Sequence, residues 1–139
     1  MRICTSFYNA DIPKEFIKVS ISTVVYPQFE KVVDYHEKGL APSYSIFKEY
    51  RDVQDEKLYA NRFKDEVLNN FDFIEFFKRF DKDSTLCLMC YETPYEFCHR
   101  HIVSEHISML FGIKVHEIGF DDKPNGFYKY IKEDKFNLF

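Results

Sequence analysis

The sequence is poor in glycine, proline and long apolar stretches, and each shortage excludes a class of protein. Its 139 residues include only 4 Gly and 5 Pro, which excludes collagen-like chains and flexible linkers. No apolar run approaches the roughly 20 residues that a membrane-spanning helix requires. Glycine-rich phosphate loops and the common hydrolase and metalloprotease motifs are also missing. The sequence therefore predicts a protein without a membrane span and without these familiar catalytic motifs.

Positive charge is scarce as well. The chain has 19 Lys and Arg against 23 Asp and Glu, a formal net charge of −4. Proteins that hold duplex nucleic acid neutralise its phosphates with Lys and Arg, so this balance does not favour an electrostatic nucleic-acid binder. A small anionic ligand in one local pocket remains compatible with it.

Aromatic residues, in contrast, are abundant. The 16 Phe and 10 Tyr provide ample material for a core, and the length fits one domain. The first residues show no apolar stretch followed by a small-residue cleavage site, which indicates a cytoplasmic protein. In that setting the four cysteines are better interpreted as thiols, metal ligands or catalytic groups than as disulfides.

Four segments have patterns typical of strands. Residues 2–8 are rich in β-branched and aromatic types, and residues 17–25 alternate between apolar and polar. Residues 85–90 form a continuous apolar run, typical of a central strand covered on both faces in a parallel sheet. Residues 114–118 predict a last strand.

Helical signals lie between these segments. The expected N-caps of the first three helices are Ser43, Asp55 and Asp72, the last for residues 73–80. Residues 93–96 have the form of a capping box, with Pro94 at the first helical position, and predict a helix that begins there and ends at Gly112.

This order of elements predicts an α/β fold. We expect a single small domain over residues 1–120, with a mainly parallel sheet of about four strands flanked by helices in a Rossmann-like, three-layer arrangement. Residues 121–139 form a C-terminal tail that packs on the domain or extends from it. Such folds bind ligands at the carboxyl ends of their strands.

Three polar segments are expected to meet at that edge of the sheet: Thr5-Ser6, Cys90-Tyr91-Glu92 and Cys98-His99-Arg100. Near a helix N-terminus, the Cys98 thiolate can be stabilised and act as a nucleophile together with His99, although a buried thiol is the plainer interpretation. Glu92 can act as a general base or form a salt bridge with Arg100.

Ligand binding is expected to centre on Arg100, because a guanidinium beside free helical N–H groups suits a phosphate or carboxylate. The alternative for Arg100 is an ion pair with Glu92 or Glu96. The other expected ligand-binding residues are Tyr91, Cys90, Thr5, Ser6 and Ser43.

A metal site is a separate possibility, built from Cys90, Cys98 and His99 or His101. Cys87 is a poor partner for Cys90, because two residues three apart on a strand point to opposite faces. Cys98 and His99 are adjacent on a helix, about 100° apart around its axis, so they need not share a metal. The sequence leaves the cofactor unknown.

The segment Cys90-Tyr91-Glu92, a spacer with proline, and Cys98-His99-Arg100 resembles the bacterial family called domain of unknown function 488. Three further segments resemble that family in order: Thr5-Ser6-Phe7, Leu40-Ala41-Pro42-Ser43 and the Tyr-x-x-Arg-Phe-x-x-Glu-Val stretch at 59–67. The resemblance implies that Cys87 is incidental. Longer members carry an arginine-bearing segment around residues 25–39 that this chain lacks. The family name implies no activity.

These features favour a small enzyme or sensor that acts on an anionic, nucleotide-like or nucleic-acid-derived ligand. Two alternatives stay open. One is a metal-binding protein that uses Cys90, Cys98 and His99 or His101. The other is a non-enzymatic interaction or regulatory protein of a bacterium or phage, in which the motif joins strand to helix through buried hydrogen bonds.

Overall fold

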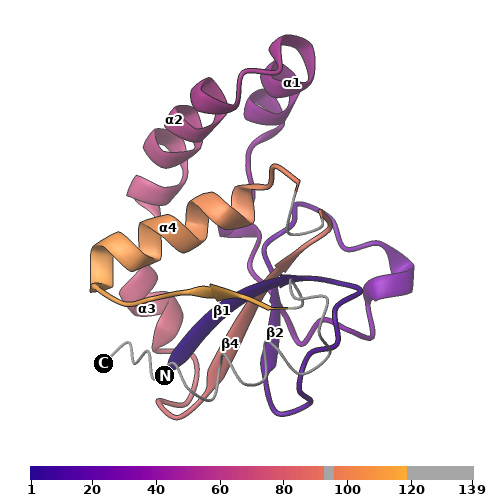
Figure 1. The fold of residues 1–139 in the computed structure, drawn as a ribbon, viewed down its shortest axis with the longest axis vertical. Helices are drawn as coiled ribbons and strands as arrows, with labels where there is room; N and C mark the ends of the chain where they lie inside the picture. The colour runs from indigo at the N-terminus through magenta and orange to yellow at the C-terminus, as the bar shows by residue number, and fades with distance from the viewer. Residues whose placement is uncertain (93–95, 119–139) are drawn as a thin grey trace.

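The structure, a computed structural model, describes residues 1–92 and 96–118 and contains a five-stranded parallel sheet (Figure 1). The strands are β1 (Arg2–Phe7), β2 (Ile17–Ser20), β3 (Tyr35–His36), β4 (Thr85–Cys90) and β5 (His116–Glu117), in the order β3-β2-β4-β1-β5. The helices are α1 (Tyr44–Val53), α2 (Glu56–Glu66), α3 (Phe73–Phe77) and α4 (His99–Phe111), with short 3₁₀ turns η1 (Pro27–Phe29), η2 (Lys38–Leu40) and η3 (Leu68–Asn70). The predicted single α/β domain with a parallel sheet is confirmed.

Strand β4 is the middle of the sheet, as its continuous apolar run predicts. It pairs with β1 on one side, where Phe7 lies opposite Cys90, and with β2 on the other, where Ser20 lies opposite Met89. Every residue of β4 after Thr85 is buried. The carboxyl ends of three strands therefore meet beside Cys90.

The two faces of the sheet have separate cores, because side chains alternate along each strand. Ile3, Leu86 and Leu88 face the larger cluster, which also contains buried apolar side chains from all four helices. Cys4, Cys87 and Met89 face the smaller cluster, with Tyr8, Ile12, Phe16 and Ile118. Cys87 thus lies on the face opposite the helices.

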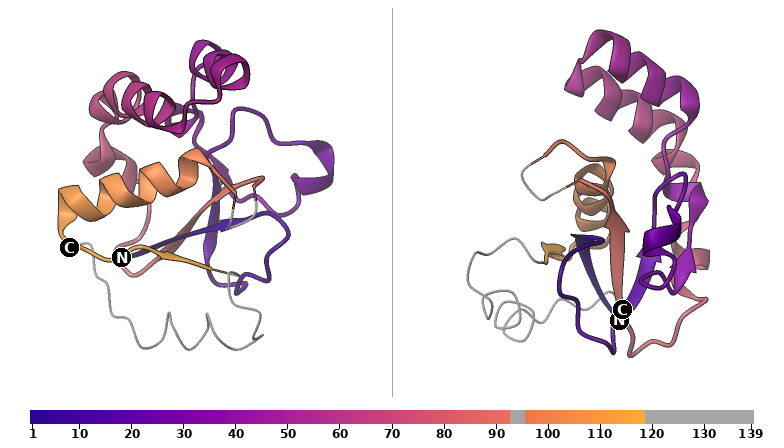
Figure 2. Two further views of the ribbon diagram at one scale, coloured as in Figure 1. Left: turned by 45° about the horizontal axis from the view of Figure 1, so that its top comes forward. Right: turned by 90° about the vertical axis from the view of Figure 1, so that its right-hand side faces the viewer.

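The predicted caps of α1, α2 and α3 are confirmed. Ser43 Oγ accepts a hydrogen bond from the Ile46 N–H, and Asp55 and Asp72 cap their helices in the same way. Helices α1 and α2 lie side by side in every view, and α4 runs across the sheet (Figures 1 and 2). Within the described part of the chain, no helix is both long and apolar enough to span a membrane.

The predicted start of α4 is wrong. The first helical residue is His99 and the N-cap is Cys98, whose Sγ accepts from the Arg100 N–H at 3.4 Å. Thr93 and Pro94 lie outside the described residues, and Glu96 and Phe97 are not helical. The Phe97 ring packs on Tyr50 and Tyr59, with centroids 4.9 and 5.0 Å apart. These long-range ring contacts outweigh the local capping pattern. The predicted end is confirmed, since Gly112 has φ 64°.

Several strand boundaries also differ from the predictions. Strand β2 is shorter than residues 17–25, because the hydroxyls of Ser20 and Ser22 both hydrogen-bond the Tyr8 hydroxyl where the chain turns away. Strand β5 and helix α3 are likewise shorter than expected, and β3 is a two-residue strand that no pattern indicated. The expected tail, residues 121–139, lies outside the described residues.

Candidate functional site

A cleft of about 540 Å³ lies where β4 ends and α4 begins. Its inner wall contains Cys90, Glu92, Cys98 and His99. Ser22 and Thr23 follow β2, and the opposite wall comes from α1 and α2. The cleft therefore lies at the carboxyl edge of the sheet, the position that α/β folds commonly use for ligands.

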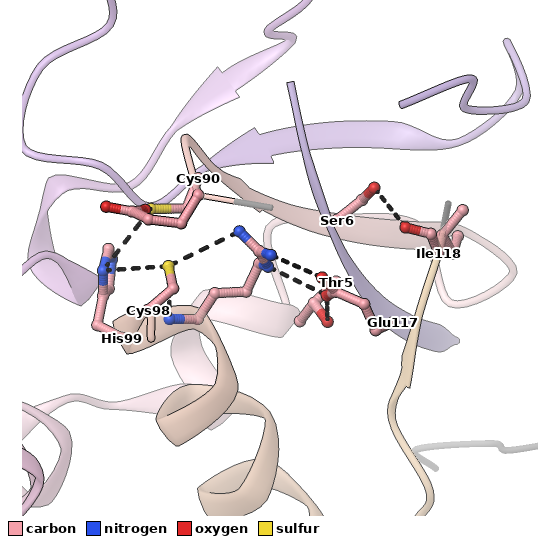
Figure 3. Close-up of polar contacts among 9 residues, drawn as sticks. Thr5, Ser6, Cys90, Cys98, His99, Glu117 and Ile118 are labelled. Carbon is pink, nitrogen blue, oxygen red and sulfur yellow. Dashed lines mark hydrogen bonds and ion pairs between the residues drawn. The ribbon is translucent and has the colours of Figure 1, made fainter. Parts of the chain in front are cut away.

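Cys90, Cys98 and His99 form the chemical centre of this cleft (Figure 3). His99 Nδ1 lies 3.7 Å from Cys90 Sγ and 3.9 Å from Cys98 Sγ. Together the two sulfurs and one ring nitrogen lie within 4.8 Å of one another. Cys98 and His99 were expected to point about 100° apart on a helix. They share one site because Cys98 is not a helical residue but the extended N-cap of α4.

The His99 ring is fixed by its second nitrogen. Nε2 lies 2.7 Å from the Ile21 carbonyl oxygen, which can only accept, so Nε2 carries a hydrogen. In the neutral ring Nδ1 is then the acceptor that faces the sulfurs. Burial lowers the pKa of His99. Cys90 and the Ile21 carbonyl raise this pKa by more than burial lowers it, so the net shift is upward. The ring is therefore poised to hold a proton beside a thiolate.

Cys90 is the sulfur that this environment ionises. A hydrogen bond from Cys98 lowers its pKa, burial opposes this, and His99 and Glu92 lower it further. Glu92 Oε2 lies 3.1 Å from Cys90 Sγ. Burial and the Cys90 charge raise the pKa of Glu92. These shifts favour the thiolate of Cys90, and they let His99 and Glu92 hold their protons more readily than usual.

Cys98 keeps its proton while Cys90 is charged. The hydrogen bond to Cys90 and burial raise the pKa of Cys98, although Arg100 lowers it. Two donors from Arg100 reach Cys98 Sγ, namely the backbone N–H at 3.4 Å and Nη1 at 3.7 Å. The pair therefore shares one negative charge, with donors available to both sulfurs.

The remaining walls of the cleft are aromatic. The lining rings belong to Tyr26, Tyr44, Phe47, Tyr50, Tyr59, Tyr91 and Phe97. No Lys or Arg belongs to the described lining. Burial raises the pKa of Tyr59, so this hydroxyl stays protonated as a donor. Such a cleft suits a flat, uncharged ring better than a phosphate.

Arg100 lies on the other side of the α4 start. Its contacts differ from the phosphate or carboxylate binding that we expected of it. Its side chain is 0% exposed and makes two bonds to Glu117, Nη2 to Oε2 at 2.6 Å and Nε to Oε1 at 3.0 Å. The guanidinium is thus occupied and does not line the cleft. The alternative partners, Glu92 and Glu96, are also replaced by Glu117, which no local spacing on α4 could indicate.

Thr5 and Ser6 belong to the Arg100 side too, and not to the cleft (Figure 3). The Thr5 hydroxyl donates to Glu117 Oε1, and the Ser6 hydroxyl donates to the Ile118 carbonyl at 2.8 Å. These bonds attach β5 and the residue that follows it to β1. The hydroxyls expected to contact a ligand therefore make structural bonds to Glu117 and Ile118.

Tyr91 and Ser43 line the cleft with their polar atoms already engaged. The Tyr91 hydroxyl donates to the Val24 carbonyl and accepts from the Tyr26 N–H, both at 2.7 Å. Ser43 caps α1. Tyr91 therefore holds the rim segment at 24–26 in place, and its ring packs against those of Tyr8, Tyr26 and Phe29.

The aromatic wall is what the sequence interpretation missed. Tyr59 and Phe97 are far apart in the sequence and were not among the expected site residues, yet both line the cleft. Phe97 directly precedes Cys98, which is the one local signal that could have drawn attention to it.

The trio also fits a metal ion. Around tetrahedral zinc, a sulfur and a nitrogen ligand lie roughly 3.6 Å apart, close to the 3.7 and 3.9 Å found here. The Ile21 carbonyl fixes His99 as outer partners of metal-bound histidines do. His101 is not part of the trio. Three ligands would leave a fourth position for a ligand from the cleft.

Comparison with family models gives a match. A family model, DUF488-N3a, described as the active DUF488-N3 subclade, matches residues 4–109, well over half of the chain and including the whole trio. The searches of curated proteins and of solved structures each found no match. The family that the strand-end and helix-start motifs resemble is therefore the right one: the chain belongs to the DUF488 family.

Proposed function

We propose that this protein is an enzyme whose Cys90 thiolate attacks a nucleotide-like ligand held in the aromatic cleft. The observation that carries the proposal is the contact between Cys90 Sγ and His99 Nδ1 on the cleft wall. A thiolate stabilised by an imidazolium is a strong nucleophile near neutral pH. The description of the matching subclade as active agrees with catalysis.

Each polar group of the site has a role in such a reaction. Cys90 forms the bond to the ligand, and His99 stays charged and positions the sulfur. The uncharged Glu92 carboxyl, 3.1 Å from the sulfur, donates a proton to the leaving group. Cys98 donates to Cys90 in the resting state.

The ligand class follows from the walls. Rings such as Phe47, Tyr50 and Phe97 can stack on a base, and stacking tolerates many bases. Because no described lining residue carries a fixed positive charge, the base enters the cleft and an anionic group of the ligand stays outside it. This refines the expected anion site, which depended on Arg100.

Alkylation tests the nucleophile directly. We expect iodoacetamide to label Cys90 at pH 6 at least about tenfold faster than an ordinary thiol, whose pKa of about 8.5 leaves it protonated there. Cys90→Ser should abolish this fast labelling, and Cys87→Ser, which changes a thiol buried on the other face, should not. Slow labelling of Cys90 would contradict the proposal and favour an interaction protein.

Nucleoside binding tests the ligand class. Thermal shifts with a panel of nucleosides and nucleotides should reveal binding that Phe47→Ala weakens about tenfold, the loss of one stacking contact. The matched control is Val53→Ala, which removes another exposed apolar side chain of α1 away from the cleft. An equal effect of both changes would contradict ring binding in the cleft.

The second candidate is a zinc protein, favoured by the distances within the trio. Elemental analysis of untagged protein purified in reductant should then give about one zinc per chain, lost in Cys90→Ser and in Cys98→Ser. Metal-free protein with a rapidly alkylated Cys90 would exclude this candidate and leave the first intact.

We also place the protein in the cytoplasm of a bacterium or of a phage host. That compartment keeps thiols reduced, which a cleft with two free cysteines requires for nucleophilic chemistry.

A further inference from the structure

Two of the four cysteines share the cleft, and the other two do not. Cys90 and Cys98 line it, with 3% and 4% of their surfaces exposed, whereas Cys4 and Cys87 are fully buried in the smaller core. The sulfurs of Cys90 and Cys98 lie within 4.8 Å of each other. A disulfide needs the two sulfurs about 2.05 Å apart, so forming one requires the two side chains to move closer together.

The donors around the pair are arranged for two successive thiolates. Cys90 has His99 Nδ1 and Glu92 beside it. Cys98 has the Arg100 N–H, Arg100 Nη1 and the same His99 nitrogen. The Arg100 N–H also caps α4, but the attack by Cys90 on a nucleotide uses neither Arg100 Nη1 nor the contact of His99 with Cys98. All three donors can stabilise a charge on Cys98.

We infer that Cys90 and Cys98 act together as a dithiol that reduces small disulfides, with Cys90 attacking first and Cys98 completing the exchange. This activity rests on the Cys90 thiolate of the proposed function. It adds a second class of substrate, an uncharged disulfide small enough to enter the 540 Å³ cleft.

The exchange balances in two steps. The Cys90 thiolate attacks R–S–S–R, a Cys90–S–S–R bond forms, and the leaving RS⁻ takes the proton of Glu92. Cys98 then loses its proton to Glu92 and attacks the Cys90 sulfur. The Cys90–Cys98 bond forms, and the second RS⁻ takes that proton. The protein loses two electrons, the small disulfide gains them, and two RSH are released.

The order of the two cysteines follows from their contacts. Cys90 Sγ lies at the end of β4 beside His99 Nδ1 and Glu92, whereas Cys98 Sγ accepts the Arg100 N–H as the cap of α4. Once Cys90 is in a mixed disulfide its charge is gone. The Arg100 donors and the His99 imidazolium then face Cys98 alone and stabilise its thiolate.

The test uses bis(2-hydroxyethyl) disulfide as the probe and peptide mass spectrometry after an acid quench. Wild-type protein should show a Cys90–Cys98 disulfide and release two thiols per chain. Cys98→Ser, in which serine still caps α4, should stop at a mixed disulfide on Cys90 and release one. Cys90→Ser should release none, and Cys87→Ser should behave like wild type.

Three outcomes would overturn the inference: a lasting mixed disulfide on wild-type Cys90, a mixed disulfide on Cys98 in Cys90→Ser, or a bond to Cys4 or Cys87. Iodoacetamide separates this failure from failure of the proposed function. Fast alkylation of Cys90 at pH 6 without a Cys90–Cys98 bond would support the Cys90 nucleophile and contradict the dithiol activity. Slow alkylation of Cys90 would contradict both proposals.

Discussion

The two sides of the α4 start use neighbouring residues for opposite purposes. His99 faces the cleft beside two thiols, whereas Arg100, the next residue, is fully buried against Glu117 on the other side. Consecutive helical residues point about 100° apart, so one step along the chain changes the environment completely. The comparison teaches that a charged residue within a functional motif can belong to the scaffold.

The two sides also differ in how their polar groups are satisfied. On the Arg100 side, Nε and Nη2 of the guanidinium and the Thr5 hydroxyl all bond Glu117, and only Nη1 reaches Cys98 Sγ. On the His99 side, the ring contacts the two sulfurs that line the cleft. We therefore expect changes on the first side to alter stability and changes on the second to alter reactivity.

The largest expected effect is that of Arg100→Ala. Removal of the guanidinium leaves Glu117 partly buried without its partner, and breaking a buried ion pair costs about 3–5 kcal/mol. Urea denaturation monitored by circular dichroism measures the loss. Adding Glu117→Gln should recover part of it, because the uncompensated charge is gone. A loss below about 1 kcal/mol would show that Arg100 is not scaffold.

The next effect is that of His99→Asn on thiol reactivity. A thiolate is present above its pKa and is lost as pH falls through that value. Without the imidazolium the pKa of Cys90 is higher, so iodoacetamide labelling at pH 6 should fall about tenfold or more. At pH 9 the difference should shrink. The control is His106→Asn, which changes another buried histidine of α4 that packs on Phe73. An unchanged pH profile in His99→Asn would contradict the pairing.

The smallest effect is that of Thr5→Val, which removes one hydrogen bond on the Arg100 side. The Thr5 hydroxyl donates to Glu117, so its loss should lower the free energy of unfolding by about 1–2 kcal/mol. Cys90 labelling should stay within about twofold of wild type, because the cleft does not include Thr5. A large change in labelling would show that the two sides are coupled.

Much of the fold could be predicted from local pattern. The apolar run at 85–90 gave the central strand, and Ser43, Asp55 and Asp72 gave three helix starts. Each of these signals depends on residues within a few positions of one another. Local pattern predicted the wrong start for α4, because the packing of Phe97 on α1 and α2 overrides the local capping box.

The site was predictable only in part, for a related reason. Residue type and position at a strand end and a helix start pointed to Cys90, Glu92, Cys98 and His99, and all four line the cleft. The sequence favoured Cys98 as the nucleophile, whereas the proposed function uses Cys90. The partners of Arg100 and the aromatic wall come from distant segments, and no periodicity connects residue 59 or residue 117 to residue 98.

The sequence by itself determined the α/β class, the parallel sheet, its central strand and the family, because apolar alternation, caps and motif residues are local properties of the chain. Only the tertiary structure decided that Cys90, Cys98 and His99 meet at one point while Arg100 turns away. Side-chain direction at a strand end and a helix start depends on how the two elements pack, and that packing is fixed by contacts across the whole domain.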